Sequence, residues 1–420
     1  MIIELRSQFN AAFTDAAYAQ LLAVLEKRCG GPIQFRVAET PIFLAKALLD
    51  EMAEQGITLA RYLMADYGYL AAARRAIPAG YDVAGQTTHP HFLTADFALV
   101  RTASGELAPR LVEIQAFPSV FSYQAELCFA YREAFDLARD LGVFLGGLNE
   151  SSFWELLRRT VLGKHSPENV VLTEVDPLHQ KTFADFHVTS RHLGIPLVDI
   201  AALEPVGNKL HYRDTAGNLT PIHRIYNRAI ADELIARNVC LPFDLAHPWD
   251  VEWAGHPNWY FLISKFSIPW LARAGRFSAV PPAVFVDDFL AGPGRDFLAA
   301  AGVPLPAIDT DEPVYAELLL KPLFSFAGKG IEFEPSRARL RAIPPAERGD
   351  YLVQQRMRFE STINTPFGPT QAEIRILYMW PDEGVLTPAL SLVRLGRGKM
   401  MGVDHNKNQQ WVGGSAAFYI

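Results

Sequence analysis

The segment Leu318–Glu334, LLLKPLFSFAGKGIEFE, carries the main clue to the fold of this chain. An apolar run ends at Lys321, a loop with two glycines and a lysine follows, and IEFE then alternates between apolar and charged residues. Period-two alternation predicts a second strand, so the segment is expected to form strand, loop, strand. A P-loop or a dinucleotide-binding turn would lead into a helix instead, and the chain contains no G-x-x-x-x-G-K-[ST] sequence.

The loop itself contains Gly328, Lys329 and Gly330. Glycine tolerates positive φ and lets backbone N–H groups approach a ligand closely. Two glycines around a lysine therefore suit an anion, and a phosphate group is the most direct candidate. An ordinary glycine hairpin with lysines on the surface explains the same residues.

A second informative segment is Ala95–Ser119, ADFALVRTASGELAPRLVEIQAFPS. Asp96 begins one strand, ASGE forms a turn, and the returning strand carries Glu113 and Gln115 two residues apart, hence on one face. Carboxylate and amide oxygens suit Mg²⁺, which also binds nucleotide phosphates. A half-exposed hairpin whose outward residues are polar is the alternative interpretation.

Composition limits the classes of function. A chain of 420 residues that is 50% hydrophobic predicts a globular protein of two or three domains. The net charge of −7 argues against nucleic-acid or acidic-membrane partners and favours small molecules. No apolar run approaches the roughly 20 residues of a membrane span, and the N-terminus lacks a secretory pattern. Three widely spaced cysteines suit free thiols, so we expect a cytoplasmic protein; no pattern indicates an oligomeric state.

The predicted secondary structure changes along the chain. The stretch 39–56, ETPIFLAKALLDEMAEQG, predicts a helix capped by Thr40, with Pro41 in its first turn and Gly56 at its end. From Asn169 onward, NVVLTEVDP, QKTFADFHVTSRHLG and IPLVDIAAL predict a strand, a helix and a strand, which is a βαβ unit. A hairpin is expected at TAGN, and a helix that is bent or broken near Pro269 follows.

Together these segments resemble the ATP-grasp superfamily, whose members hold ATP between two α+β lobes and join a carboxylate to an amine through an acyl-phosphate. In ordinary members the glycine loop precedes the metal hairpin, whereas here the hairpin comes first. The chain is therefore similar to the circularly permuted branch, which includes glutathionylspermidine synthase and its bacterial relatives. The resemblance implies an α+β fold, namely a circularly permuted ATP-grasp fold with a Rossmann-like βαβ pre-grasp domain.

The resemblance also implies a domain division. Residues 1–150 would form a helical segment plus the metal-ligand hairpin, and residues 151–300 the Rossmann-like domain. Residues 301–420 would form the ATP-grasp lobe, with the glycine-rich phosphate loop and the adenine hinge.

Site residues follow from the same resemblance. Asp96, Glu113 and Gln115 would bind Mg²⁺, although the family usually has asparagine where Gln115 stands. Arg375 and Arg394 would stabilise the transferring phosphoryl group.

The remaining implied residues contact the nucleotide. Lys265 and Lys321 match the two nucleotide-binding lysines, and a lid over the phosphates is formed by Ser325, Gly328, Lys329 and Gly330. The segment YLVQQRM resembles the hinge strand whose main-chain groups read the adenine edge, which places Gln354 and Gln355 beside the base.

The implied function is that of an ATP-dependent carboxylate–amine ligase with ATP and Mg²⁺ as cofactors and a small-molecule carboxylate and amine as substrates. Two alternatives stay open. Gln115 and the altered hinge would also suit a catalytically degenerate ATP-binding scaffold or regulator, and the same fold could serve an ATP-dependent phosphotransferase. No residue pattern identifies the acid or the amine.

Overall fold

The computed structural model describes residues 1–102, 104–307, 313–324, 330–401, 406 and 408–420. The strands of these residues form four β-sheets, of seven, four, four and three strands. None of the helices in these ranges combines the length and apolarity needed to cross a bilayer.

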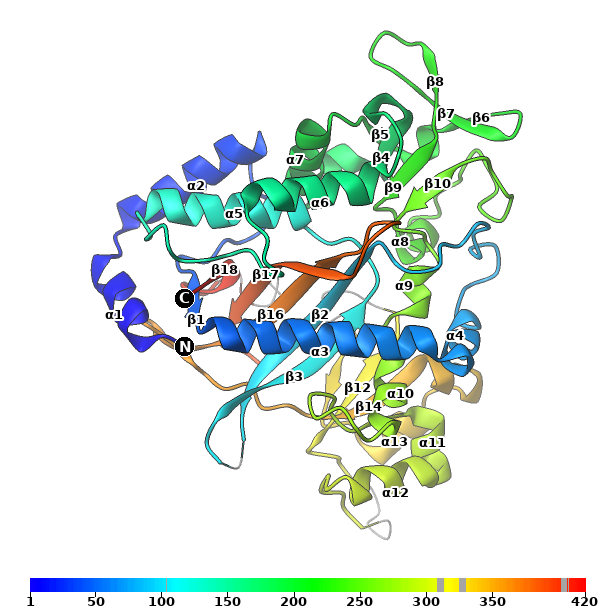
Figure 1. Cartoon of the computed structure of the whole chain (residues 1–420). Coiled ribbons are helices and arrows are strands. Elements are labelled where there is room, and N and C mark those ends of the chain that lie inside the picture. The colour runs from blue at the N-terminus through cyan, green and yellow to red at the C-terminus, as the bar shows by residue number, and fades with distance from the viewer. Residues whose placement is uncertain (103, 308–312, 325–329, 402–405, 407) are drawn as a thin grey trace.

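The largest sheet joins the two ends of the chain. Its strand order is β1-β18-β17-β16-β2-β3, with β15 paired to β16, and only the β1–β18 pairing is parallel within these described strands. The strands are β1 Ile42–Leu44, β2 Phe92–Arg101, β3 Leu107–Gln115, β15 Ile363–Thr365, β16 Gly368–Met379, β17 Thr387–Gly396 and β18 Gly413–Tyr419. The termini consequently lie near each other at one end of the molecule (Figure 1).

Helices cover both faces of this sheet, because alternate residues of each strand point to opposite faces. Helix α3 (Lys46–Ala65) packs on one face against residues such as Ile374 and Val393. Helix α5 (Phe121–Ala134) packs on the other face over β17 and β18, with α2 (Asp15–Cys29) and α6 (Glu150–Leu162) on the same side (Figure 1).

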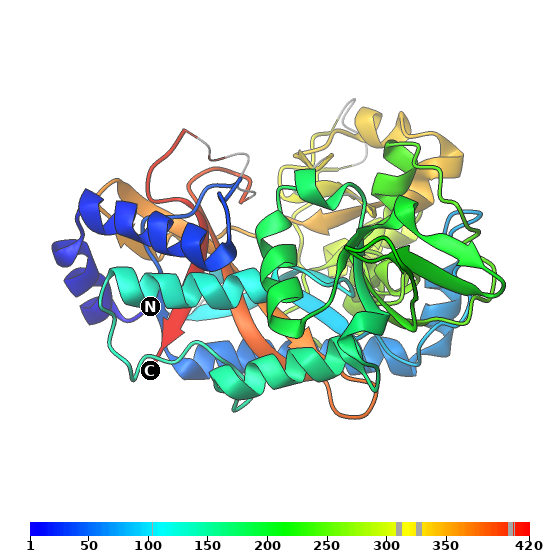
Figure 2. The ribbon, with the colours of Figure 1, turned by 90° about the horizontal axis from the view of Figure 1, so that it is seen from above.

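The Rossmann-like sheet lies at the end of the molecule away from the termini (Figures 1 and 2). Its order is β10-β9-β4-β5 and all its pairings are parallel. The strands are β4 Val170–Glu174, β5 Leu197–Asp199, β9 Arg224–Asn227 and β10 Glu252–Ala254. Helix α7 (Phe183–Leu193) connects β4 to β5, so the predicted βαβ unit is confirmed.

A small antiparallel sheet projects from this region. It contains β6 (Glu204–Val206), β7 (Lys209–Arg213) and β8 (Leu219–Pro221). The hairpin between β7 and β8 turns at the predicted TAGN segment.

The remaining sheet has the order β11-β14-β12-β13 and is antiparallel. Its strands are β11 Ala283–Phe285, β12 Leu318–Pro322, β13 Glu332–Phe333 and β14 Tyr351–Gln355. Because β12 pairs with β13, the strands predicted on either side of the glycine loop are confirmed. Residues 325–329 of the loop lie outside the described residues.

The other helical elements connect and cover these sheets. The α-helices are α1 Ile3–Ala12, α4 Tyr67–Arg74, α8 Ala231–Ala236, α9 Trp259–Leu262, α10 Ser267–Arg273, α11 Val286–Ala291, α12 Pro293–Ala300 and α13 Arg337–Arg341. The 3₁₀ turns are η1 Pro167–Asn169, η2 Pro177–His179, η3 Ile200–Ala202 and η4 Pro345–Asp350.

The helix predicted for residues 40–56 is displaced in the structure. Residues 42–44 form strand β1, because they pair with β18, and α3 begins only at Lys46. Gly56 lies inside α3 instead of ending it. A Cβ atom at Gly56 would lie 2.1 Å from the hydroxyl oxygen of Tyr378, so glycine permits the close approach of helix and sheet.

Two further expectations change. The break in the helix predicted for residues 258–275 lies between α9 and α10, and Pro269 is inside the first turn of α10. The predicted domain boundary at residue 301 separates β11 from β12, although both belong to one sheet. The predicted C-terminal lobe also includes β15–β18, which belong to the large sheet, where β16 pairs with β2 of the N-terminal hairpin.

Candidate functional site

Seven largely buried charged side chains meet on the face of the large sheet opposite α3, where it adjoins β12. We call them the charge cluster: Asp96 on β2, Glu113 on β3, Glu373 and Arg375 on β16, Arg394 on β17, Lys321 on β12, and Lys265 between α9 and α10. Six of the seven were predicted from the sequence. The structure therefore brings together residues that are up to 298 positions apart.

The register of the sheet sets this arrangement. Asp96 lies directly opposite Glu113 on one side and Arg375 on the other, and Glu373 lies opposite Arg394. The register of β2 and β3 shifts after Asp96, which leaves Val112 unpaired as a β-bulge. Bulges re-aim side chains and often occur beside active sites. The carbonyl of Val112 accepts a hydrogen bond from Lys321 Nζ at 3.4 Å.

Asp96 is held by both arginines. Arg375 donates from Nε to Oδ1 at 2.5 Å and from Nη2 to Oδ2 at 2.7 Å, and Arg394 Nη1 donates to Oδ2 at 3.2 Å. Burial would raise the pKa of Asp96, but the two guanidinium charges outweigh it and the pKa lies below its usual value. Asp96 is thus a buried, ionised carboxylate.

The two arginines are bound differently. Arg375 also donates from Nη1 to Ser119 Oγ at 3.2 Å, and its Nη2 lies 3.6 Å from Glu113 Oε1. Within the part of the chain that the structure describes, the hydrogen bonds of Arg394 all run through Nη1, to Asp96 and Glu373. The Arg394 side chain is also 23% exposed. Arg375 is therefore fixed in place, whereas Arg394 keeps donors for a ligand.

The lysines approach from the other side. Lys321 Nζ donates to Gln354 Oε1 at 3.0 Å, and burial lowers the pKa of Lys321 to about 8 although the charge of Glu113 opposes this. Lys265 Nζ lies 3.7 Å from Glu113 Oε2. Both lysines thus add positive charge beside Glu113.

Glu373 was missed in the sequence. It lies two residues before Arg375, so period-two spacing on β16 places both on one face and could have identified it. Burial raises the pKa of Glu373, and Asp96 and Glu113 act in the same direction while Arg394 opposes them. Since four cations face three carboxylates, the cluster carries an excess of positive charge that suits an anion.

The predicted hinge strand is paired on both edges. Strand β14 lies between β11 and β12, and the backbone N–H of Gln355 donates to Pro282 O at 2.8 Å. Gln354 is paired with β11 and β12, and the N–H of Gln355 is already bonded, while the predicted contact of this strand with an adenine edge stays a prediction. The amide nitrogen of Gln354 is buried and has no hydrogen-bond partner among the described residues.

The loop residues are only partly placed. Gly330 adopts a φ of +77°, a conformation that favours glycine. Ser325, Gly328 and Lys329 lie outside the described residues, so their predicted contact with phosphates stays a prediction.

Asp96, one of the three predicted Mg²⁺ ligands, does not fit a metal ion in this arrangement, whereas metal binding by Glu113 and Gln115 stays a prediction. Both oxygens of Asp96 already accept guanidinium hydrogen bonds. Gln115 ends β3 and lies opposite Thr94. Over the described ranges, no three His, Cys, Asp or Glu side chains gather as a metal site would require.

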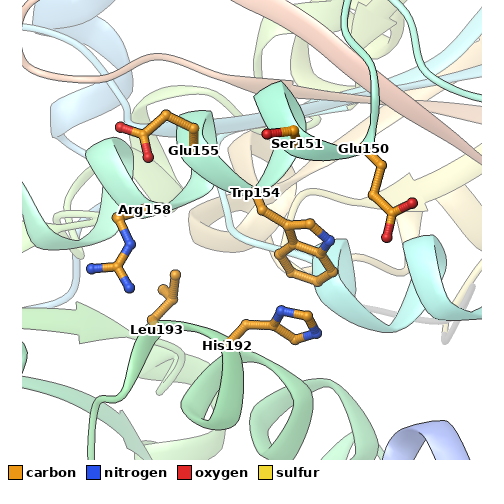
Figure 3. Close-up of a pocket in the computed structure, with 7 residues that line it drawn as sticks. All are labelled: Glu150, Ser151, Trp154, Glu155, Arg158, His192 and Leu193. Atoms are coloured by element: carbon orange, nitrogen blue, oxygen red, sulfur yellow. The ribbon is translucent and has the colours of Figure 1, made fainter.

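A separate surface pocket of about 620 Å³ lies between α6 and α7. It is lined by Glu150, Ser151, Trp154, Glu155, Arg158, His192 and Leu193 (Figure 3). The rings of Trp154 and His192 are stacked, with their centroids 3.8 Å apart. No member of the charge cluster lines this pocket, so the size of a hollow alone does not mark the candidate site.

Comparisons with known proteins bear on the fold. A scan against protein-family models found no matching family, and a search of curated proteins found no match. Among solved structures, a glutathione synthetase-like effector (GSS30) from Globodera pallida, in its apo form, matches with a TM-score of 0.57 and 12% identity, over 98% of this chain and 99% of that chain.

A second structure, described as a γ-glutamylcysteine synthetase from Methylobacillus flagellatus KT, has a TM-score of 0.38 and 14% identity. It covers 81% of this chain and 82% of that one, and a likeness at this level carries no argument. The first match shows a mixed α+β fold shared with a glutathione synthetase-like protein over nearly the whole chain. The circular permutation stays a prediction.

Proposed function

We propose that this chain is an ATP-dependent ligase that binds ATP at the charge cluster and joins a carboxylate to an amine through an acyl-phosphate. The observation that carries the proposal is the convergence of four cations, which come from four separate segments and meet where β12 adjoins the large sheet. The fold likeness to a glutathione synthetase-like effector supports this reaction class.

The chemistry requires cations around the transferring phosphoryl group, because negative charge spreads over its oxygens in the transition state. Lys265 and Lys321 would hold the phosphates, and Arg394 would donate to the γ-phosphate through the nitrogens that Asp96 and Glu373 leave open. Arg375 would contribute a fixed charge.

In the first step an oxygen of the substrate carboxylate attacks the γ-phosphorus, the bond to the leaving oxygen of ADP breaks, and an acyl-phosphate forms. In the second step the amine nitrogen attacks the acyl carbon, inorganic phosphate leaves, and the nitrogen gives its proton to solvent. Water would hydrolyse the acyl-phosphate, so a closing lid is needed, and the loop around residues 325–330 is the proposed lid.

We also propose a cytoplasmic location. The three cysteines are free thiols, as the sequence predicts, and two of them are buried. Free thiols suit a reducing compartment.

A catalytically degenerate ATP-binding scaffold or regulator is the second candidate. The bonding of Asp96 to two arginines favours it, because a predicted metal ligand is already occupied. Gln115 and Gln355, which differ from the family pattern, point the same way.

The test is ADP formation in the presence of pooled carboxylates and amines, with hydroxylamine added to trap an acyl-phosphate as a hydroxamate. We expect turnover and a hydroxamate, both abolished by Lys321→Met and retained by Lys46→Met, a control at an exposed surface pair. ATP binding without turnover would support the scaffold. Turnover without hydroxamate would support a phosphotransferase.

A further inference from the structure

Asp96 is bonded in a way that differs from an open metal ligand. Its side chain is 1% exposed and accepts three hydrogen bonds from two guanidinium groups. Mg²⁺ binds carboxylate oxygens at about 2.0–2.1 Å, so it would have to take the positions that the arginine donors occupy. Two adjacent guanidinium charges would also repel a divalent cation.

Glu113, on the neighbouring strand, is bonded differently. Its nearest cationic nitrogens, from Arg375 and Lys265, lie at 3.6 and 3.7 Å, beyond ordinary hydrogen-bond distance. Its side chain is 17% exposed. Of the two carboxylates in the hairpin, Glu113 is therefore the one whose oxygens can accept a new ligand.

We propose that Asp96 is a positioning residue that holds Arg375 and Arg394 for anion binding, and that it does not coordinate a metal. This inference rests on the proposed ATP function. Arg375 is held by hydrogen bonds to Asp96 and Ser119. Arg394 donates from Nη1 to both Asp96 and Glu373. The other nitrogens of Arg394 are thereby set in one orientation for phosphate oxygens.

The first experiment measures Mn²⁺ affinity by electron paramagnetic resonance in the presence of a non-hydrolysable ATP analogue. We expect Asp96→Asn to change the Mn²⁺ dissociation constant less than about threefold, and Glu113→Gln to raise it about tenfold or more. Asp50→Asn, which alters an exposed carboxylate–lysine pair, is the matched control. A tenfold loss in Asp96→Asn with nucleotide affinity intact would overturn the inference alone.

The second experiment tests positioning through a double-mutant cycle. Arg394→Gln should weaken binding of the analogue by about 10- to 100-fold in the wild-type background, as charged hydrogen bonds do. In the Asp96→Asn background the same change should have a much smaller effect, because Arg394 is no longer held. Effects that multiply independently would contradict a positioning role.

A third measurement uses the wild-type protein, in case Asp96→Asn does not fold. The Nε–H of Arg375, assigned with Arg375→Lys, should stay protected from exchange when Mg²⁺ and the analogue are added, because Asp96 keeps its bond. Loss of that protection would show that Asp96 turns to the metal. No analogue binding by the wild type would overturn the proposed function, and the inference with it.

Discussion

The charge of Lys321 depends on the surroundings of its side chain. Burial lowers its pKa to about 8 from the usual 10.5. A bound polyanion favours the protonated amine, so the pKa of Lys321 should be higher in the complex. Affinity for an ATP analogue should therefore fall as pH rises through 8, by up to about tenfold per pH unit.

Calorimetric titration between about pH 6.5 and 9.5 checks this expectation. Lys321→Met should bind more weakly at neutral pH and lose most of the pH dependence, because no amine is left to titrate. An unchanged slope in Lys321→Met would assign the titration to another group.

Glu174, at the end of β4, should make the stability of the protein depend on pH. Burial raises the pKa of Glu174 to about 8, although the backbone N–H of Val175 donates to its carboxylate. Between its unfolded pKa of 4.5 and about 8, the folded chain holds a proton that the unfolded chain has released. This group's contribution to stability is thus present at low pH and lost as pH rises through that window.

Glu174→Gln removes the titration. We expect it to raise the free energy of unfolding at alkaline pH by on the order of 2 kcal/mol and to flatten the pH dependence. Urea unfolding across the window checks it, with the exposed Glu204→Gln as control. Parallel pH profiles for wild type and Glu174→Gln would disprove the assignment.

At the residue scale, the sequence predicted which residues belong to the charge cluster, but it did not predict which of them form hydrogen bonds and ion pairs with one another. The positions of Asp96, Glu113, Lys265 and Lys321 follow from motif resemblance, and all lie in the cluster. Which carboxylate meets which cation depends on cross-strand register, which no local pattern encodes. Arg375 therefore takes up the oxygens of a predicted metal ligand.

At the scale of elements, the hairpin of β2 and β3 shows the same limit. Both strands and the turn follow from alternation and from ASGE. The bulge at Val112 could not be predicted, because one extra residue in a strand leaves no distinct sequence signal. That single residue nevertheless sets Glu113 opposite Asp96 and frees a carbonyl for Lys321.

The close contact between helix α3 and strand β16 can be tested at Gly56. Gly56→Ala would place a methyl group against the Tyr378 hydroxyl, so helix and sheet must separate. We expect a loss of about 2 kcal/mol in the free energy of unfolding. At Gly31 a Cβ atom meets nothing within 4 Å, and Gly31→Ala should stay within about 0.5 kcal/mol of wild type.

Denaturant unfolding of both variants measures the difference. Equal stability of the two would mean that the contact between α3 and β16 is loose. The same close contact explains why a glycine that resembles a helix stop lies inside the helix.

At the scale of the whole molecule, Arg224 links the Rossmann-like sheet to the large sheet. It is 1% exposed, and its nitrogens lie 2.9 Å from Glu252 Oε2 and 2.9 Å from Asp382 Oδ2. Asp382 belongs to the connection between β16 and β17. One buried guanidinium thus joins parts of the chain that form separate sheets.

Arg224→Met should lower the free energy of unfolding by about 2 kcal/mol, because methionine cannot replace the guanidinium hydrogen bonds to Glu252 and to the buried carbonyls of Thr160 and Val161. Arg213→Met removes an exposed ion pair with Glu204 and should cost less than about 1 kcal/mol. Calorimetric melting of both variants checks the contrast. If both variants lost the same free energy of unfolding, the buried Arg224 would stabilise the protein no more than an exposed ion pair does.

The pairing of distant strands is the feature of the fold that the sequence could not predict. The βαβ unit is local and was found, whereas the large sheet pairs β1 with β18 and β2 with β16 across most of the chain. Pairings at such separation depend on which strands collapse together, and no window of neighbouring residues records them.

In the proposed complex, the charge cluster holds a triphosphate between the large sheet and the sheet of β12. A crystal structure with a non-hydrolysable ATP analogue tests it most directly. We expect phosphate oxygens within hydrogen-bond distance of Lys321 and Arg394. An analogue bound instead in the pocket beside Trp154 and His192, with the charge cluster empty at saturating nucleotide, would contradict it.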